Sequence, residues 1–219
     1  MVSATATSPA LELTAVGTDG ELVVRALSGR EDGFAELVRR YQRPISAYVY
    51  RMVGDYDSSL DLTQEVFIKV HNSLAKFSPE YKFSTWIYKI AHNAAIDHLR
   101  RNSTRERALV WESEGTSFEL PIESKALTPE QLTEKRERRD EIEAVIRILP
   151  PAQRELIILR HSHDLSYDEI AEVTGLPLGT VKSRLHSAVA AFANKWKTMN
   201  RVSPGGVPAT GTEAEDFRQ

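Results

Sequence analysis

Residues 166–185 have the sequence SYDEIAEVTGLPLGTVKSRL, whose spacing predicts two helices joined by a tight turn. Gly175 stands where a helix ends in the left-handed conformation, and Pro177 prevents that helix from continuing. Ala171, Gly175 and Val181 have the spacing of a helix-turn-helix. In that motif the small residue lets the helices approach, the glycine makes the turn and the branched residue fixes the angle.

Ser166 and Glu169 form the pattern of a capping box, which predicts where the first of these helices begins. The second helix starts at Gly179 or Thr180 and keeps an apolar face through Val181 and Leu185. Its opposite face carries side chains that can reach phosphates and base edges in a major groove. These are Thr180, Lys182, Ser183, Arg184, His186 and Ser187. Spacing alone leaves open an ordinary helical hairpin with a solvated outer face.

Composition suits a folded chain with local basic surfaces. The 219 residues have room for one large domain or two small ones, and 41% of them are apolar. The net charge is −3, yet basic residues outnumber acidic ones in 82–107 and in 176–201. Such segments are typical of phosphate contacts or, alternatively, of solvated helix faces.

Several classes of protein are excluded. The chain has no cysteine, which rules out disulfides and thiolate metal sites. No apolar run approaches the roughly 18 residues of a membrane span. The N-terminus lacks the basic start and apolar core of a signal peptide. We therefore expect a soluble cytoplasmic protein that does not insert into membranes.

Apolar periodicity predicts four helices before the motif region, over 20–27, 31–53, 57–74 and 85–101. Asp19 and Ser84 are the expected N-caps of the first and last. Leu27 and Leu60 are expected on inward stripes, and Pro44 should kink or break the second helix. No segment alternates with a period of two. Residues 19–103 therefore form a compact helical bundle.

The rest of the chain predicts a second helical domain and flexible segments. Residues 104–127 carry Glu112, Glu114, Glu119 and Glu123, which suggests an acidic linker or a loop without a role. A helix starts again at Thr128-Pro129, and 128–200 hold four helices. Residues 1–18 and 201–219 are expected to be disordered. The fold class is all-α, with two small helical domains joined by a flexible acidic linker.

Little in the sequence indicates catalysis. There is no glycine-rich phosphate loop and no nucleophile elbow, so no enzyme activity and no cofactor are expected. His161 and His163 could chelate a metal, but a solvated helix terminus is the simpler interpretation. Phe77 and Tyr81 lie in a predicted loop, where an aromatic ring could stack on an unpaired base or pack in the core.

Three segments together carry a resemblance to a known family. They are DLTQEVFIKV at 61–70, FSTWIYKIAHNAAIDHLRR at 83–101, and LPPAQRELIILRHSHDLSYDEIAEVTGLPLGTVKSRLHSA at 149–188. The chain resembles bacterial sigma factors of the extracytoplasmic-function (ECF) type, which direct RNA polymerase to promoters. The resemblance covers residues 20–198. It implies a region 2 bundle, a region 4 helix-turn-helix domain and a linker that passes near the polymerase active centre.

The resemblance also implies roles for individual residues. Core polymerase would bind Asp61, Gln64, Glu65 and Phe67. The minus-ten element would be recognised and opened by Lys76, Phe77, Ser78, Lys82, Asn93, Asp97, Arg100 and Arg101. The minus-thirty-five element would be read by the outer face of the helix-turn-helix named above. After KSRLH the family usually continues with arginines, whereas Ser187, Ala188 and Val189 follow here, which implies weaker phosphate contacts.

The implied partners are core RNA polymerase, promoter DNA and an anti-sigma factor. Some 25 linker residues extend to roughly 80 Å, enough to bridge the roughly 70 Å of two turns of duplex. One alternative is a free-standing helix-turn-helix regulator, which would have no use for the segments at 61–70 and 83–101. A signalling enzyme with a DNA-binding domain would need a catalytic constellation that the sequence lacks.

Overall fold

The structure is a computed structural model that describes residues 17–78, 80–106 and 129–202. Every regular element in these ranges is helical, which confirms the predicted all-α class. The elements are α1 Asp19–Leu27, α2 Glu31–Val53, α3 Tyr56–Ser73, the 3-10 helix η1 Leu74–Lys76, α4 Phe83–Glu106, α5 Pro129–Arg147, α6 Pro151–Ile157, the π-helical turn η2 Ile158–Ser162, α7 Tyr167–Thr174 and α8 Leu178–Val202.

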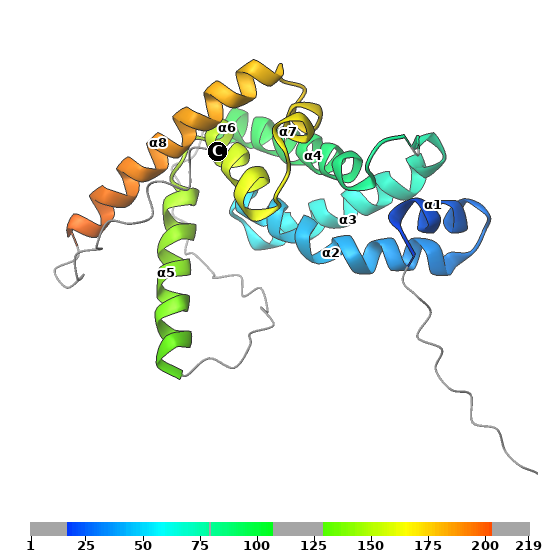
Figure 1. Cartoon of the computed structure of the whole chain (residues 1–219), viewed down its shortest axis with the longest axis horizontal. Coiled ribbons are helices and arrows are strands. Elements are labelled where there is room, and N and C mark those ends of the chain that lie inside the picture. The colour runs from blue at the N-terminus through cyan, green and yellow to red at the C-terminus, as the bar shows by residue number, and fades with distance from the viewer. Residues whose placement is uncertain (1–16, 79, 107–128, 203–219) are drawn as a thin grey trace, which may run out of the picture.

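The first four helices form a bundle. α1 packs on α2, α2 on α3 and α3 on α4, and α4 also contacts α2 (Figure 1). The apolar side chains predicted to face inward supply most of the core between these helices. Those that are completely buried include Ile45, Tyr48, Val49, Met52, Val66, Val70, Ile87, Ala91 and Ala95.

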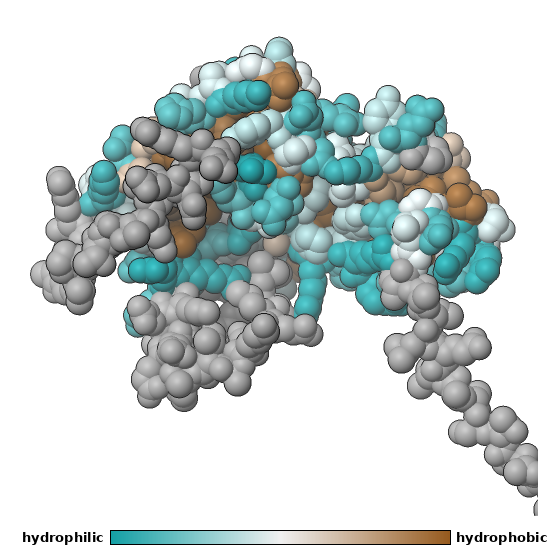
Figure 2. Space-filling view, viewed as in Figure 1, coloured by the Kyte–Doolittle hydropathy of each residue, from teal (hydrophilic) through white to brown (hydrophobic). Residues whose placement is uncertain are grey.

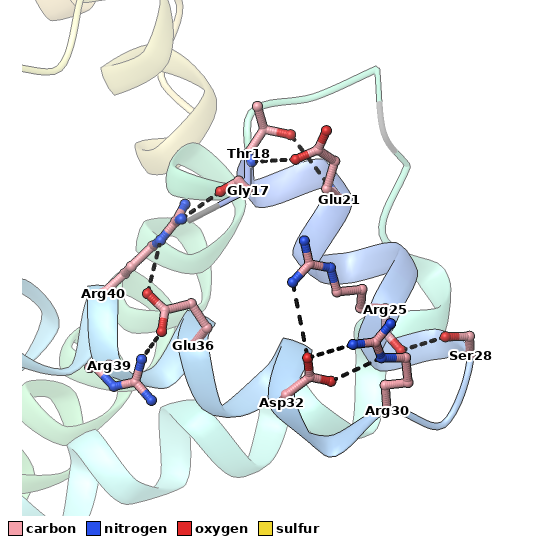
Figure 3. A network of polar contacts seen from close by, with 10 residues as sticks. All are labelled: Gly17, Thr18, Glu21, Arg25, Ser28, Arg30, Asp32, Glu36, Arg39 and Arg40. Carbon is pink, nitrogen blue, oxygen red and sulfur yellow. Dashed lines mark hydrogen bonds and ion pairs between the residues drawn. The ribbon is translucent and has the colours of Figure 1, made fainter. Parts of the chain in front are cut away.

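Close approach and ion pairing hold α1 against α2. A Cβ atom at Gly33 would lie 2.6 Å from the carbonyl oxygen of Leu22, so only glycine permits this helix contact. Arg40 on α2 reaches across to donate to the Asp19 carboxylate at 2.7 Å. It also donates to the Gly17 carbonyl at 2.5 Å (Figure 3). The arginine therefore fastens the start of α1 to the middle of α2.

Two predicted N-caps are wrong by one or two residues. The N-cap of α1 is Thr18, whose hydroxyl accepts from the backbone N–H of Glu21 in a capping box, and Asp19 is the first helical residue. Thr18 caps the helix because Glu21, three residues later, completes the capping box. α4 begins at Phe83, so Ser84 lies inside the helix instead of capping it.

Two apolar residues predicted to face inward are exposed. Leu27 is 51% exposed, beside Val24 at 62%, and Figure 2 shows apolar atoms gathered at the end of the molecule where α1 lies. Leu60 is 38% exposed, and the buried residue of that turn is Leu62 at 5%. Leu62 is four residues before Val66 and shares its helix face, whereas Leu60 does not.

Pro44 lies inside α2 without breaking it, because the helix runs unbroken from Glu31 to Val53. Proline removes one backbone donor and usually distorts a helix. Here the turn that follows is fixed by the buried Ile45, Tyr48 and Val49. Of the predicted kink or break, the break is therefore wrong.

The later helices form a second group, in which α8 packs against α5, α6 and α7. α5 has Pro129 at its first position, as predicted. α6 ends at Ile157, where the chain widens into the π-helical turn η2. Such turns are rare and often mark functional sites. This one places His163 at its C-terminal end.

The two groups of helices are packed together. α7 lies along α4, and both α5 and α6 contact α2 (Figure 1). Buried residues of both groups belong to one continuous apolar cluster. α4 continues to Glu106, past the predicted start of the linker at 104. The remainder of that linker, at 107–128, and most of the two predicted disordered ends lie outside the described residues.

Candidate nucleic-acid and partner interfaces

The helix-turn-helix forms as its sequence predicts, except that α8 begins at Leu178 and not at Gly179 or Thr180. The Ser166 hydroxyl accepts from the Glu169 N–H at 3.3 Å, and the Glu169 carboxylate accepts from the Ser166 N–H at 2.8 Å. Gly175 ends α7 with φ of 70°, a left-handed conformation that favours glycine. Val181 on α8 is completely buried, in the apolar cluster that also contains Ile170 and Val173 of α7. The capping box, the turn and the locking residue are thus confirmed.

The expected DNA-binding residues share the outer face of α8. Val181, Leu185 and Ala188 point into the core, with at most 5% exposure. Thr180 is half-buried, and the other five residues of the set are exposed: Lys182, Ser183, Arg184, His186 and Ser187. Hydroxyl, amine, guanidinium and imidazole groups therefore project from one surface, as contact with a major groove requires.

The residues expected at the minus-ten element lie on η1, the following loop and α4. Lys76, Lys82, Asn93, Asp97, Arg100 and Arg101 are exposed, and Ser78 is half-buried. On α4, Arg100 pairs with Asp97 at 3.1 Å, and the Arg101 side chain donates to the Asp97 carbonyl. Asp97 thus holds two arginines on the outer surface of the helix, where they can reach phosphates.

Phe77 is the member of this set that the structure buries. It is 8% exposed, with its ring centroid 5.3 Å from that of Trp86 and 5.6 Å from that of Phe83. The core interpretation therefore describes Phe77 better than base stacking does. Tyr81 behaves differently, because it is 56% exposed at the tip of the same loop.

The expected polymerase-binding residues lie on α3. Asp61 and Gln64 are exposed, and Glu65 pairs with Lys69 at 2.6 Å. Phe67 is half-buried and packs against the core, so it contributes less to this surface. Sequence analysis missed Ile68, which is 59% exposed. Its spacing of four from Gln64 places it on the same helix face and could have identified it.

A buried polar cluster joins the two groups of helices, and sequence analysis missed it. Glu155 on α6 is only 4% exposed, although glutamate side chains usually lie at the surface. Its Oε1 accepts from the Tyr48 hydroxyl at 2.7 Å and contacts Nδ1 of His92. Burial, followed by the charge of Glu155, raises the pKa of Tyr48 well above its ordinary value, so the phenol stays protonated and donates.

Further polar contacts surround this cluster. Arg51 at the end of α2 donates from Nε to both oxygens of Glu143 on α5, at 2.9 and 3.0 Å. Lys82 is 2.8 Å from Glu169 on α7. The Glu169 carboxylate therefore accepts from both its own helix cap and the loop before α4.

The histidines considered as a metal site have other surroundings. Among the described residues, no group of three or more His, Cys, Asp or Glu side chains could hold a metal ion. His163 contacts the Tyr88 hydroxyl at 2.6 Å. No helix in the described part of the chain is long and apolar enough to cross a membrane.

Two family models match the chain. The one described as Sigma-70 region 2 matches residues 37–105, and the one described as Sigma-70, region 4 matches residues 139–192. The first contains the expected minus-ten and polymerase-binding residues. The second contains the outer face of α8.

Curated relatives match over most of their length. The chain is 35% identical to the ECF RNA polymerase sigma factor SigW of Bacillus subtilis over 173 residues, which cover 78% of this chain and 92% of SigW. It is 36% identical to the ECF RNA polymerase sigma-E factor of Escherichia coli over 186 residues, which cover 84% of this chain and 97% of the relative.

Solved structures include the same fold. The sigma factor RpoE of Bartonella quintana, in complex with the anti-sigma factor NepR, matches with a TM-score of 0.59 and 19% identity. The match covers 78% of this chain and 98% of the other. The helical architecture therefore recurs in a solved protein of distant sequence.

Proposed function

The chain belongs to the extracytoplasmic-function (ECF) family of RNA polymerase sigma factors, and from this premise we propose which surfaces recognise promoter DNA and which bind core polymerase. As a sigma factor the protein directs promoter-specific initiation of transcription. It acts by binding, without a catalytic step of its own, and it works in the cytoplasm, where polymerase and promoters are.

The outer face of α8 is the proposed surface that reads the minus-thirty-five element. The exposure of its polar and basic side chains is the main observation behind this assignment. Lys182 and Arg184 are exposed on α8, whereas Val181, which precedes them in sequence, is completely buried. Basic and hydroxyl side chains on a recognition helix can both position the protein on phosphates and contact base edges. Of the residues that follow KSRLH, Ala188 is completely buried, whereas Ser187 is exposed and faces outward.

The loop after η1 and the outer face of α4 are the proposed minus-ten surface. A base captured from the duplex must be stabilised by stacking and edge contacts that offset a few kcal/mol of unstacking. The exposed Tyr81 can offer a ring, whereas Phe77 supports the loop from beneath. Lys76, Arg100 and Arg101 supply charge for the phosphates of the separated strand.

The exposed face of α3 is the proposed contact with core polymerase. It combines Asp61, Gln64 and Glu65 with the exposed Ile68. An apolar side chain in the centre of a polar patch is the usual composition of a protein interface. Phe67 takes part mainly by holding α3 in place.

We also propose that an anti-sigma factor controls this protein. The support is that the similar RpoE is described in complex with the anti-sigma factor NepR. Such a partner would keep the sigma factor from core polymerase until a signal releases it.

Transcription in vitro tests the proposed function. Purified protein and core polymerase are incubated with a library of promoter fragments, and transcripts are counted against core polymerase alone. Promoter-specific starts, together with co-elution of the protein and core, are expected. If the protein bound duplex DNA but neither bound core nor started transcripts, it would be a free-standing regulator instead.

A further inference from the structure

The packed arrangement of the two groups of helices conflicts with binding to a whole promoter. The proposed minus-ten and minus-thirty-five surfaces lie on α4 and α8, and α7 packs directly against both helices. The two promoter elements lie about 70 Å apart, two turns of duplex. Both surfaces can therefore bind one promoter only after the second group of helices moves away from the first.

We infer that the described arrangement is an autoinhibited state, held closed by a latch in which Glu155 of α6 inserts between Tyr48 of α2 and His92 of α4. This inference rests on the proposed function, because it concerns how the two DNA-binding surfaces are kept apart from their promoter.

The chemistry of the latch makes closing specific. A buried carboxylate is costly unless hydrogen bonds replace its water. Glu155 belongs to the second group of helices, but Tyr48 and His92, which satisfy it, belong to the first. In an open molecule all three side chains would be solvated. The bonds therefore form only when the two groups close in this register.

Two further contacts cross the same boundary and act in the same direction. Arg51 and Glu143 join α2 to α5 through paired hydrogen bonds. Lys82 joins the minus-ten loop to Glu169. In the closed state the Lys82 ammonium is thus engaged by the helix-turn-helix, where a phosphate would otherwise be its partner.

A reversible cross-link tests the inference directly. The chain has no cysteine, so introduced thiols react alone. Lys82→Cys and Glu169→Cys are combined, and the two thiols are joined by a bismaleimide that contains a reducible disulfide. We expect the linked protein to support at least tenfold less promoter-specific initiation with core polymerase than the same protein after reduction. Since initiation before and after reduction is measured on the same variant, any loss of activity caused by replacing Lys82 is the same in both measurements.

The outcomes separate the latch from the proposed function. Equal initiation before and after reduction would overturn the latch while leaving the sigma-factor function intact. If the unmodified protein neither bound core polymerase nor initiated transcripts, the proposed function would fail, and the latch would fail with it.

A second measurement follows opening without transcription. Fluorophores are attached at Gln42→Cys and Asn194→Cys, both exposed positions, on α2 and α8. Tyr48→Phe and, separately, Glu155→Ala are expected to raise the fraction of molecules with well-separated dyes at least tenfold. Glu172→Ala, which removes an exposed carboxylate from α7, is the matched control and should leave that fraction unchanged. Unchanged dye separation in both latch variants, with helical content preserved, would overturn the latch.

Discussion

The hydroxyl of Tyr88, on α4, lies 2.6 Å from Nδ1 of His163, which follows the π-helical turn η2. Burial raises the pKa of Tyr88, so the phenol keeps its proton and can donate it. Burial, and then the nearby charge of Arg51, lowers the pKa of His163 from 6.5 to about 4. The imidazole is therefore neutral in the folded protein at neutral pH and can accept.

This pair predicts that acid weakens the fold. Between pH 6.5 and pH 4 the unfolded chain binds a proton at His163 that the folded chain does not, so the free energy of unfolding falls as the pH falls. From pH 8 to pH 5 this residue alone should remove about 2 kcal/mol. Urea denaturation at several pH values measures the change.

Substitution isolates the contribution of this residue. His163→Gln cannot be protonated, so its stability should fall less steeply between pH 8 and pH 5 than that of the wild type. Gln42→Ala, at an exposed position on α2 and without a titratable group, should keep the wild-type dependence. If His163→Gln followed the wild-type curve, the assignment of the acid sensitivity to His163 would be wrong.

Arg184→Ala should weaken promoter binding and leave core binding intact. The guanidinium is exposed on the recognition face, and loss of one phosphate contact lowers the salt slope of log K by about 1. Fluorescence anisotropy of a promoter duplex with the complex of protein and core polymerase, over a range of salt concentrations, measures both quantities. Glu172→Gln, on the neighbouring helix, is the control. An unchanged salt slope would show that Arg184 makes no phosphate contact.

Gln64→Ala combined with Ile68→Ala should have the opposite effect, with weaker core binding and unchanged binding to DNA. Both side chains are exposed on α3, so the fold should survive with a change of stability of about 0.5 kcal/mol or less per site. Phe67→Ala should instead lower stability by more than 1 kcal/mol, because the ring packs on the core. Co-elution with core polymerase and thermal unfolding separate the two effects.

Gly175→Ala should destabilise the helix-turn-helix by about 1 kcal/mol, because φ of 70° disfavours a side chain. A Cβ atom would meet no neighbour within 4 Å at either Gly175 or Gly179, so crowding does not distinguish them. Gly179 is in the first turn of α8 without a left-handed φ, and Gly179→Ala should stabilise slightly. Equal melting temperatures for the two variants would contradict the conformational argument.

The helix-turn-helix could be predicted because its signals are local. Ser166, Glu169 and Gly175 determine their own turn, and Val181 follows the helical period. Leu60 was wrongly placed on the buried face because Leu60 and Leu62 lie in the same helical turn. Apolar periodicity alone does not decide which of the two leucines is buried. Ile68 was missed because apolar periodicity marks only the buried face of a helix, whereas the spacing that identifies Ile68 is to the polar Gln64.

The latch lay beyond sequence reasoning for a different reason. Glu155 is 107 residues from Tyr48 and 63 from His92, and no local pattern connects them. A glutamate in a charged chain is usually solvated, so its burial follows only from the packing of α6 on α2. Because a flexible linker was predicted, the sequence did not indicate how the two domains lie relative to each other. The latch exists only where the two groups of helices pack together.

Loss of the Arg154 side chain should destabilise both groups of helices at once. Its guanidinium donates to the Met52 carbonyl at 2.9 Å, at the end of α2, and to the carbonyls of Arg147 and Leu149 at 2.6 and 3.1 Å, at the end of α5. Carbonyls at a helix C-terminus lack intrahelical partners and carry partial negative charge, so one cation satisfies two helix ends.

Arg154→Lys keeps the charge but cannot donate in two directions at once, because the ammonium is a compact group and the guanidinium a planar fork. We expect a loss of about 2 kcal/mol in the free energy of unfolding. Hydrogen exchange should show faster opening at the ends of both α2 and α5. Arg147→Lys, which leaves the backbone carbonyl in place, is the matched control. Faster exchange at only one helix end would mean that Arg154 supports that helix alone and does not join the two groups.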